Sequence, residues 1–180
     1  MHQFNIDASL FESARAVKIV FLDVDGVLTD GTIYYGAQGE SLKPFNTLDG
    51  QGLKYLIDEG LVVAIISGRG SEGLKARALD LGVQELHMNV SDKRRLAQDI
   101  LNRHGLDWSQ AAAMGDDWPD LPILNLVGLS SAPKTAHPEL RSRVHWVSQE
   151  NGGHGAVREL CDLILRAQGR YDTLLNGYLT

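Results

Sequence analysis

Three stretches of this chain are almost wholly apolar and then end in polar residues. They are VKIVFLDVDG (17–26), LVVAIISGRG (61–70) and AAAMGDD (111–117). Continuous apolar runs that contain β-branched residues are typical of strands buried on both faces of a parallel sheet. Weaker runs at 84–90 and 126–131 fit the same interpretation. The pattern therefore restricts the chain to folds that cover both faces of a sheet.

Helical periods separate these runs, at 51–60, 71–82 and 92–105. Strands that alternate with helices of this length predict successive βα units. We therefore expect an α/β fold, a Rossmann-like three-layer parallel sheet with helices on both faces. A short helix at 8–16 precedes the first strand, and an amphipathic helix at 155–171 follows the last one.

One segment breaks the alternation. Residues 32–46, TIYYGAQGESLKPFN, contain two short strand-like pieces around a glycine-rich turn. They predict a β-hairpin inserted directly after the first strand. Residues 172–180 show no period and are interpreted as a C-terminal tail. A chain of 180 residues is expected to form one domain, so we assign 1–180 to a single unit.

Charge and composition exclude several classes of function. The chain has 17 Lys and Arg against 23 Asp and Glu, a net charge of −6, which argues against binding to nucleic acid or to an anionic membrane. One cysteine excludes an internal disulfide and a multi-cysteine zinc site. No apolar run approaches the ~18 residues of a membrane span, and the first residues lack a signal-peptide pattern. We expect a cytoplasmic protein.

Polar side chains follow four of the predicted strands. They are Asp23, Asp25, Ser67, Arg69, Lys93, Asp116, Asp117 and Asp120. Open α/β sheets bind ligands at the carboxyl ends of their strands, so we expect these groups to surround one site. Several carboxylates in one crevice repel one another unless a cation compensates them, and oxygen ligands favour Mg²⁺ with a substrate phosphate. A hydroxyl and a lysine suit phosphate oxygens, and an aspartate can accept a phosphoryl group.

Four motifs occur in order: DVDGVLTDG (23–31), IISGR (65–69), Lys93 at a helix start, and GDDWPD (115–120). Together they resemble the motifs of haloacid dehalogenase-type phosphohydrolases. A narrower resemblance, to the 3-deoxy-D-manno-octulosonate 8-phosphate phosphatases, covers nearly the whole chain. It includes the hairpin, FNTLDGQGLK (45–54) and GGHGAVRELCDLILRAQG (152–169).

The resemblance implies a fold without a large cap domain, an activity and an assembly. The activity is Mg²⁺-dependent hydrolysis of a sugar-acid phosphate through an aspartyl-phosphate, in the synthesis of a lipopolysaccharide precursor. The assembly is a homotetramer that the hairpin helps to build. In this arrangement a neighbour's C-terminal tail lies near the active site and closes it.

The resemblance also implies roles for individual residues. Asp23 resembles the nucleophile, and Asp25 the general acid that later acts as a base on water. Asp23, the backbone carbonyl of Asp25, and Asp116 resemble the Mg²⁺ ligands. Ser67 and Lys93 resemble the groups that hold the phosphate. Because side chains two apart on a strand share a face, Asp23 and Asp25 can address one phosphate.

A second set of residues is expected to meet the substrate. The family's substrate loop corresponds to Asn46, Thr47, Leu48, Asp49 and Gly50, and the phosphate or sugar carboxylate is expected to meet Lys54, Arg69 and Arg77. Asp117 and Asp120 either orient the metal ligands or are ordinary acids of a first helical turn. Leu48, Lys54 and His154 stand where family members usually carry arginine. This departure bears on substrate affinity and identity, not on reaction class.

Three other interpretations remain open. A phosphatase for a nine-carbon sialic-type sugar-acid 9-phosphate shares the fold and the hairpin, although GGHGAVREL (152–160) favours the eight-carbon substrate. A phospho-receiver domain places its acidic pair before the acceptor aspartate, which is not the order here. A non-catalytic scaffold would not need every motif residue. The glycines at 152–155 also predict a mobile segment near the site.

Overall fold

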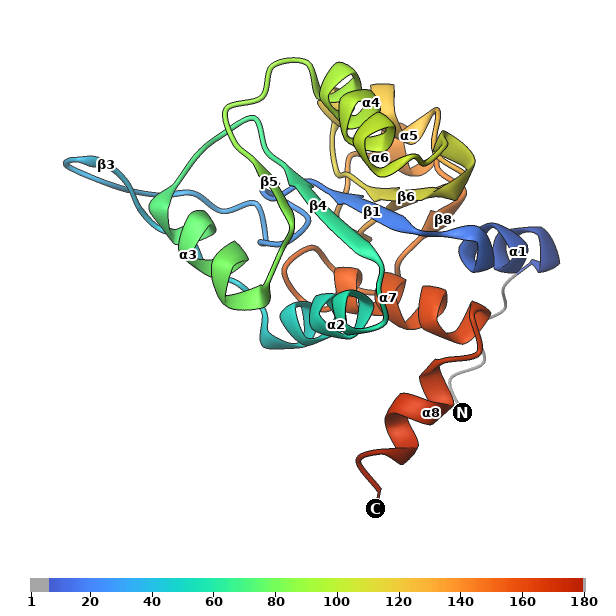
Figure 1. The fold of residues 1–180 in the computed structure, drawn as a ribbon. Coiled ribbons are helices and arrows are strands. Elements are labelled where there is room, and N and C mark those ends of the chain that lie inside the picture. Colours follow the sequence, from blue (N-terminus) through green and yellow to red (C-terminus); the bar gives the residue numbers. More distant parts are fainter. Residues whose placement is uncertain (1–6, 180) are drawn as a thin grey trace.

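The structure is a computed structural model that describes residues 7–179 (Figure 1). Its centre is a sheet of six strands in the order β5-β4-β1-β6-β7-β8, and every neighbouring pair is parallel. The strands are β1 (Ile19–Leu22), β4 (Val62–Ile66), β5 (Glu85–His87), β6 (Ala111–Met114), β7 (Leu129–Ala132) and β8 (Trp146–Val147). The α/β prediction is confirmed, and β8 is the one strand of this sheet that it omitted.

Helices cover both faces of the sheet (Figure 1). One face carries α1 (Ala8–Ala16), α2 (Thr47–Asp58), α3 (Glu72–Leu81) and α7 (Ala156–Ala167). The other carries α4 (Lys93–His104), α5 (Leu121–Leu124) and α6 (Pro138–Arg141). Two short 3₁₀ turns, η1 (Trp108–Gln110) and η2 (Trp118–Asp120), flank β6.

The apolar runs are continuous because each strand contributes side chains to two hydrophobic clusters, one on each face of the sheet. In β1, Val20 and Leu22 pack on the side of α2 and α7, whereas Ile19 and Phe21 pack on the side of α4. All four are at most 2% exposed. Alternate side chains of a strand point to opposite faces, so a sheet covered on both sides selects an apolar residue at every position.

The helices begin and end at capping residues, and the cap of α2 corrects the sequence analysis. Helix α3 begins after Ser71, whose hydroxyl accepts the N–H of Leu74, and ends at Gly82 in the left-handed region. Helix α2 begins four residues before the predicted start at 51, because the Asn46 side chain accepts the N–H of Leu48 and caps it. The predicted substrate loop 46–50 is therefore mostly the first turn of a helix.

The inserted hairpin is present and stands apart from the main sheet (Figure 1). Its strands, β2 (Tyr34–Gly36) and β3 (Gly39–Leu42), pair antiparallel as a separate two-stranded sheet. Tyr35 and Leu42 are 69% and 61% exposed. No large cap accompanies the hairpin in residues 7–179.

The C-terminal part differs from the prediction. The helix expected at 155–171 ends at Ala167, and Gly169, with φ +71°, separates it from α8 (Tyr171–Asn176). Helix α8 takes up part of the segment interpreted as a tail, although it buries no residue. Residues 1–6 and 180, which the single-domain prediction includes, lie outside the described part. In residues 7–179 no helix is long and apolar enough to cross a membrane.

Candidate active site

The carboxyl ends of the parallel strands meet at one edge of the sheet, as the sequence predicts. Asp23 directly follows β1, and its backbone N–H donates to the carbonyl of Met114, the last residue of β6. Asp116 lies two residues after that strand. Lys93 is the first residue of α4. Three side chains distant in sequence are thus brought to one edge by the parallel strands and by the turns and the helix that follow them.

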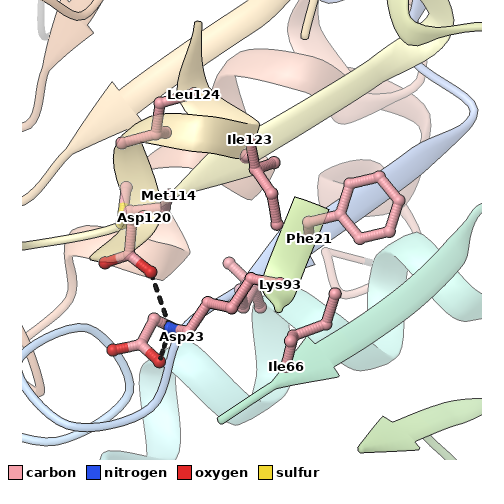
Figure 2. Close-up of a pocket in the computed structure, with 10 residues that line it drawn as sticks. Phe21, Asp23, Ile66, Lys93, Met114, Asp120, Ile123 and Leu124 are labelled. Atoms are coloured by element: carbon pink, nitrogen blue, oxygen red, sulfur yellow. Dashed lines mark hydrogen bonds and ion pairs between the residues drawn. The ribbon is translucent and has the colours of Figure 1, made fainter. Parts of the chain in front are cut away.

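The ammonium group of Lys93 lies between two carboxylates (Figure 2). Its Nζ is 2.7 Å from Oδ1 of Asp23 and 2.7 Å from Oδ1 of Asp120. Phe21 and Ile66 line the same pocket beside the lysine. Burial alone would lower the pKa of Lys93, but the two ion pairs outweigh it and raise that pKa above its usual value. Lys93 is therefore a fixed positive charge.

Asp120 organises the turn that carries Asp116. Its second oxygen, Oδ2, accepts the backbone N–H groups of Asp116 at 3.1 Å and Asp117 at 3.4 Å. Both oxygens of Asp120 are thus occupied by protein donors. Among the described residues, no donor bonds to the carboxylate of Asp116. The predicted orienting role fits the contacts of Asp120. The exposed Asp117 caps the η2 turn, and its negative charge contributes to raising the pKa of Asp116.

The acidic groups lie close enough to share a cation. Asp23, Asp116 and Asp120 each offer an oxygen within 4.8 Å of the other two. Burial, together with the negative charge of Asp120, raises the pKa of Asp23 to about 6 in spite of Lys93. Burial and the charges of Asp23 and Asp120 raise the pKa of Asp116 to about 7. Buried carboxylates this close together repel one another when both are ionised, and a cation between them removes that repulsion. Carboxylate oxygens are also the donors that a hard divalent ion such as Mg²⁺ prefers.

A glycine permits this crowding. Gly26 has φ +92°, in the left-handed region, and a Cβ at this position would collide with Oδ2 of Asp116. The buried hydroxyl of Thr29 accepts the N–H groups of Gly26 and Gly31 and so organises the same turn. The loop after β1 can therefore lie directly against the Asp116 carboxylate.

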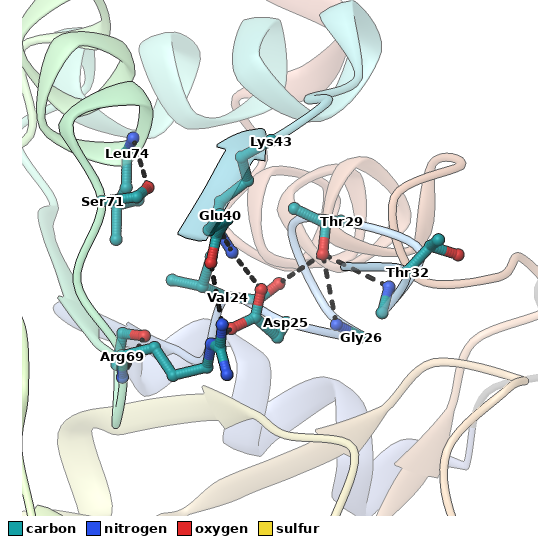
Figure 3. A network of polar contacts seen from close by, with 12 residues as sticks. Val24, Asp25, Gly26, Thr29, Thr32, Glu40, Lys43, Arg69, Ser71 and Leu74 are labelled. Atoms are coloured by element: carbon teal, nitrogen blue, oxygen red, sulfur yellow. Dashed lines mark hydrogen bonds and ion pairs between the residues drawn. The ribbon is translucent and has the colours of Figure 1, made fainter. Parts of the chain in front are cut away.

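Asp25 belongs to a neighbouring network that includes the hairpin (Figure 3). Its carboxylate is paired with Lys43, which lies just after β3, and with Arg69 at 3.6 Å. Glu40 of β3 joins both cations, at 3.1 Å to Lys43 and 3.0 Å to Arg69. Tyr35 accepts a further bond from Arg69 at 3.3 Å. The charged groups that face Asp25 are therefore cations held by the hairpin and by the turn after β4.

The sequence analysis did not single out Glu40 and Lys43. Their side chains are 12% and 6% exposed, which is unusual for charged residues of a hairpin. The sequence offers only the charge pattern GESLK as a signal, and such a pattern is also typical of a solvated hairpin. They reach the site because the hairpin folds back toward Asp25.

Ser67 lies at a strand end, as predicted: it directly follows β4, the strand that neighbours β1 in the sheet. The residue is 2% exposed. Its hydroxyl accepts the backbone N–H of Arg69 at 3.1 Å. Since the hydroxyl hydrogen remains available, Ser67 can still donate to an anion. Its assignment to phosphate binding stays a prediction.

The expected substrate residues of α2 point in different directions. Leu48 is 57% exposed, and Thr47 is also exposed. Asp49 is 1% exposed, and its carboxylate accepts the N–H groups of Gly155 and Arg158 at 3.2 and 2.8 Å. Burial raises the pKa of Asp49, although these backbone bonds oppose the shift. The geometry gives Asp49 a contact with α7 in place of an open substrate contact.

Arg77 packs against Gly50 on the same side. A Cβ at Gly50 would collide with the Arg77 guanidinium, which also pairs with Asp80 at 2.8 Å. Lys54 is half-buried and His154 is exposed. Arg69 is the expected substrate residue that the structure brings next to Asp25. The substrate assignments of the others stay predictions.

The glycine-rich segment at 152–155, predicted as a mobile segment near the site, lies against the loop that follows β1. The N–H of Gly153 donates to the carbonyl of Val27 at 2.9 Å, and that of Gly152 to the Thr135 hydroxyl at 3.1 Å. A Cβ at Gly152 would collide with the carbonyl oxygen of Gly26. The glycines thus permit close contact between two backbones.

This chain is similar in sequence and in structure to known hydrolases. A model for haloacid dehalogenase-like hydrolases matches residues 84–160. The 3-deoxy-D-manno-octulosonate 8-phosphate phosphatase of Escherichia coli is 41% identical over 167 residues, 93% of this chain and 89% of that protein. The solved structure of the Yersinia pestis enzyme of that name is 42% identical, with a TM-score of 0.91 over 93% of this chain and 90% of that one.

A further solved structure contains ligands. It is the 3-deoxy-D-manno-octulosonate 8-phosphate phosphatase of Moraxella catarrhalis in complex with a magnesium ion, a phosphate ion and a KDO molecule. It is 34% identical to this chain, with a TM-score of 0.91 over 94% of this chain and 97% of that one. The similarity thus covers the whole sheet and the edge where the carboxylates gather.

Proposed function

This chain belongs to the 3-deoxy-D-manno-octulosonate 8-phosphate phosphatase family of haloacid dehalogenase-like hydrolases, and from that premise we propose that it hydrolyses this sugar-acid phosphate to the free sugar acid and phosphate. The chain is a phosphoric monoester hydrolase. The observation that carries the choice of site is the gathering of the Asp23, Asp116 and Asp120 carboxylates, with the Lys93 ammonium between those of Asp23 and Asp120. The resemblance further supports a place in lipopolysaccharide precursor synthesis, in the cytoplasm.

The proposed cofactor is Mg²⁺, held by the carboxylates of Asp23 and Asp116 and by the backbone carbonyl of Asp25. The donor set fits, because no described donor bonds to the Asp116 carboxylate and a carboxylate such as that of Asp23 has lone pairs beyond its bond to Lys93, whereas both oxygens of Asp120 are engaged by Lys93 and by backbone N–H groups. When bound, the ion supplies positive charge against the phosphate oxygens. The relative from Moraxella catarrhalis, which carries magnesium, supports this choice.

In the proposed reaction, an oxygen of Asp23 attacks phosphorus and forms an aspartyl-phosphate, and the bond to the sugar oxygen breaks. Lys93, fixed by its ion pair with Asp120, neutralises charge on the phosphoryl oxygens together with the Ser67 hydroxyl. Asp25 gives a proton to the departing sugar oxygen. It then takes a proton from the water that hydrolyses the aspartyl-phosphate.

Proton transfer by Asp25 needs a change at its ion pairs. Lys43 and Arg69 face the Asp25 carboxylate, and both are themselves held by Glu40. We propose that arrival of the anionic substrate draws Arg69 from Asp25 toward the phosphate or the sugar carboxylate. An arginine fork suits either anion. Arg69 is 40% exposed, so it has room to move.

We also propose a homotetramer in which a neighbour's C-terminal tail closes the site. The hairpin supports this, because Tyr34, Tyr35 and Leu42 are 44%, 69% and 61% exposed on a two-stranded sheet that stands away from the core. No residue of helix α8 is fully buried within its own chain, although Tyr171 and Leu174 pack against the core, and Leu175 is 47% exposed. Sedimentation at micromolar concentration is expected to give a tetramer, and a monomer alone would contradict this assembly.

The substrate assignment is tested by a phosphate-release screen over sugar-acid phosphates, with and without Mg²⁺. We expect the eight-carbon 8-phosphate to give the highest kcat/KM, and activity to vanish on chelation. A higher kcat/KM for a nine-carbon 9-phosphate would overturn the substrate but leave the reaction class.

The nucleophile is tested separately. Asp23→Asn keeps the size of the side chain but replaces the nucleophilic carboxylate with a neutral amide, so we expect turnover to be abolished. Asp58→Asn, an exposed change of the same kind on α2, is the matched control and is expected to keep full activity. Turnover by Asp23→Asn, in protein free of other phosphatases, would refute the assignment.

A further inference from the structure

Helix α7 begins at a residue that cannot cap it. Its N-cap is Gly155, with φ +109°, and no side chain of its own start bonds to the free N–H groups. The first N–H groups of a helix need acceptors, and an anion there is favoured by the helix dipole. That acceptor comes from α2, 106 residues away, because the Asp49 carboxylate bonds the N–H groups of Gly155 and Arg158.

The segment before this helix start lies against the catalytic loop. Gly152 and Gly153 contact the backbone between Gly26 and Asp30, and the N–H of Gly153 donates to the carbonyl of Val27. Gly26 in turn abuts the carboxylate of Asp116. Contacts therefore run from Asp49 through the glycine segment to the loop that joins Asp25 to the metal-binding edge.

We propose that Asp49 is a positioning residue: by capping α7 it fixes residues 152–155 against the loop at 24–30, and so sets the position of that loop relative to Asp116. This inference rests on the proposed function for the identity of the site. It departs from the family-based expectation that Asp49 contacts the substrate. Its side chain is buried and already accepts two backbone bonds, so it has little left to offer to a sugar.

The test compares Asp49→Asn with wild type on two substrates, the sugar-acid phosphate and p-nitrophenyl phosphate, which carries no sugar. The amide can accept one of the two N–H groups but presents its own N–H to the other. We expect kcat to fall roughly tenfold on both substrates, because a misplacement of about 1 Å can cost about 100-fold in rate. We also expect more Mg²⁺ to be needed for half-maximal activation, with little change in KM.

The control is Asp58→Asn, which removes the same charge from an exposed position of the same helix and is expected to keep wild-type kinetics. All rates are taken well below the Tm of each variant. A rise in KM confined to the sugar substrate would overturn the inference in favour of substrate contact. A lower Tm with unchanged kcat would overturn it in favour of a merely structural cap. Because p-nitrophenyl phosphate carries no sugar, the effect of Asp49→Asn on kcat can be measured with it even if the proposed sugar substrate is wrong.

A second variant reaches the same contact without touching Asp49, in case Asp49→Asn does not fold. In Gly153→Ala, the new Cβ would meet the backbone of Thr29 and Asp30, so the segment must move away from the loop. Gly169→Ala is the matched control, since its φ of +71° is similar to +68° at Gly153 but nothing lies within 4 Å of its Cβ. We expect Gly153→Ala alone to lose kcat on both substrates. Wild-type kcat in Gly153→Ala would overturn the inference.

Discussion

At the scale of single residues, the site depends on close approach of like charges. Asp23 and Asp116 lie within reach of one cation, and the pKa values of both carboxyls are raised, chiefly because they are buried. Lys93 offsets part of this charge but is itself shared with Asp120. Gly26 has no side chain, and this lets the loop after β1 lie directly against the Asp116 carboxylate.

The first prediction concerns this glycine. In Gly26→Ala, the Cβ would collide with the Asp116 carboxylate, so we expect Mg²⁺ activation to weaken by roughly 10-fold or more, as for small misplacements of catalytic groups. Gly60→Ala is the control, because Gly60 has a similar φ of +83° but open space around its Cβ. Backbone strain is thus common to both variants, and the collision is not. Equal Mg²⁺ dependence in the two would contradict the account.

Residues of this site differ in how far the sequence predicts them. Asp23 directly follows β1, Asp116 lies two residues after β6, and Lys93 opens a helix, so local pattern and parallel topology predict that they meet at one edge of the sheet. Glu40 and Lys43 lie in the inserted hairpin, and only the path of the folded chain brings them to Asp25. No local pattern encodes that path.

At the scale of elements, the hairpin carries two kinds of side chain. Tyr35 and Leu42 are exposed, whereas Glu40, the cross-strand neighbour of Tyr35, and Lys43, which lies just after β3, join the network of Asp25 and Arg69 (Figure 3). One inserted element thus provides both a surface for assembly and charges for the site. This arrangement couples the position of the hairpin to that of the proposed general acid.

The second prediction tests this coupling. Lys43→Met keeps the apolar stem but leaves Asp25 and Glu40 with Arg69 as their one remaining cation among the residues of this network. We expect kcat to fall at least roughly tenfold, since a general acid contributes about 10²–10⁴-fold and depends on its position. We expect unfolding to be easier by about 2 kcal/mol, less than the ~3–5 kcal/mol of a fully buried pair, because Asp25 is partly exposed.

Lys75→Met is the control for this variant. Lys75 is an exposed lysine of α3 whose partner, Glu72, is 4.0 Å away, so its loss is expected to leave kcat and Tm unchanged. If Lys43→Met behaved like Lys75→Met, the coupling of the hairpin to Asp25 through Lys43 would be refuted.

Elements were predictable where a pattern is long and regular. The runs that form β1, β4 and β6 are apolar throughout, because each faces two cores. Strand β8 has two residues, too few for any period. Helix α2 includes Gly50 and Gly52, which disfavour helix, so its first turn is not evident without the Asn46 cap. The break between α7 and α8 is set by Gly169, one glycine within a continuing helical period.

At the scale of the whole molecule, the crowded carboxylates make the free energy of unfolding and the binding of Mg²⁺ depend on pH. The pKa values of Asp23 and Asp116 are raised from 3.8 to about 6 and about 7. Each therefore binds its proton more tightly in the folded than in the unfolded chain. For metal-free protein, these two groups lower the free energy of unfolding as pH rises from about 4 to about 7. Mg²⁺ needs them ionised, so protons compete with it over the same range.

The third prediction follows from this linkage. We expect Mg²⁺ to raise Tm more at pH 8 than at pH 5, because at pH 5 both carboxylates are largely protonated in the metal-free protein. Calorimetry at both pH values, with and without the ion, measures the difference. In Asp116→Asn, the gain at pH 8 is expected to be lost. An equal Tm gain at both pH values would contradict a site made of these carboxylates.

A crystal structure of the protein with Mg²⁺ and beryllium fluoride, a mimic of a phosphoryl group, tests the central claim most directly. We expect one ion to contact the carboxylates of both Asp23 and Asp116, at about 2.1 Å as Mg²⁺ requires. The fluoride adduct is expected on Asp23. An ion that contacts only one of these two carboxylates, or an adduct on any other residue, would contradict the account.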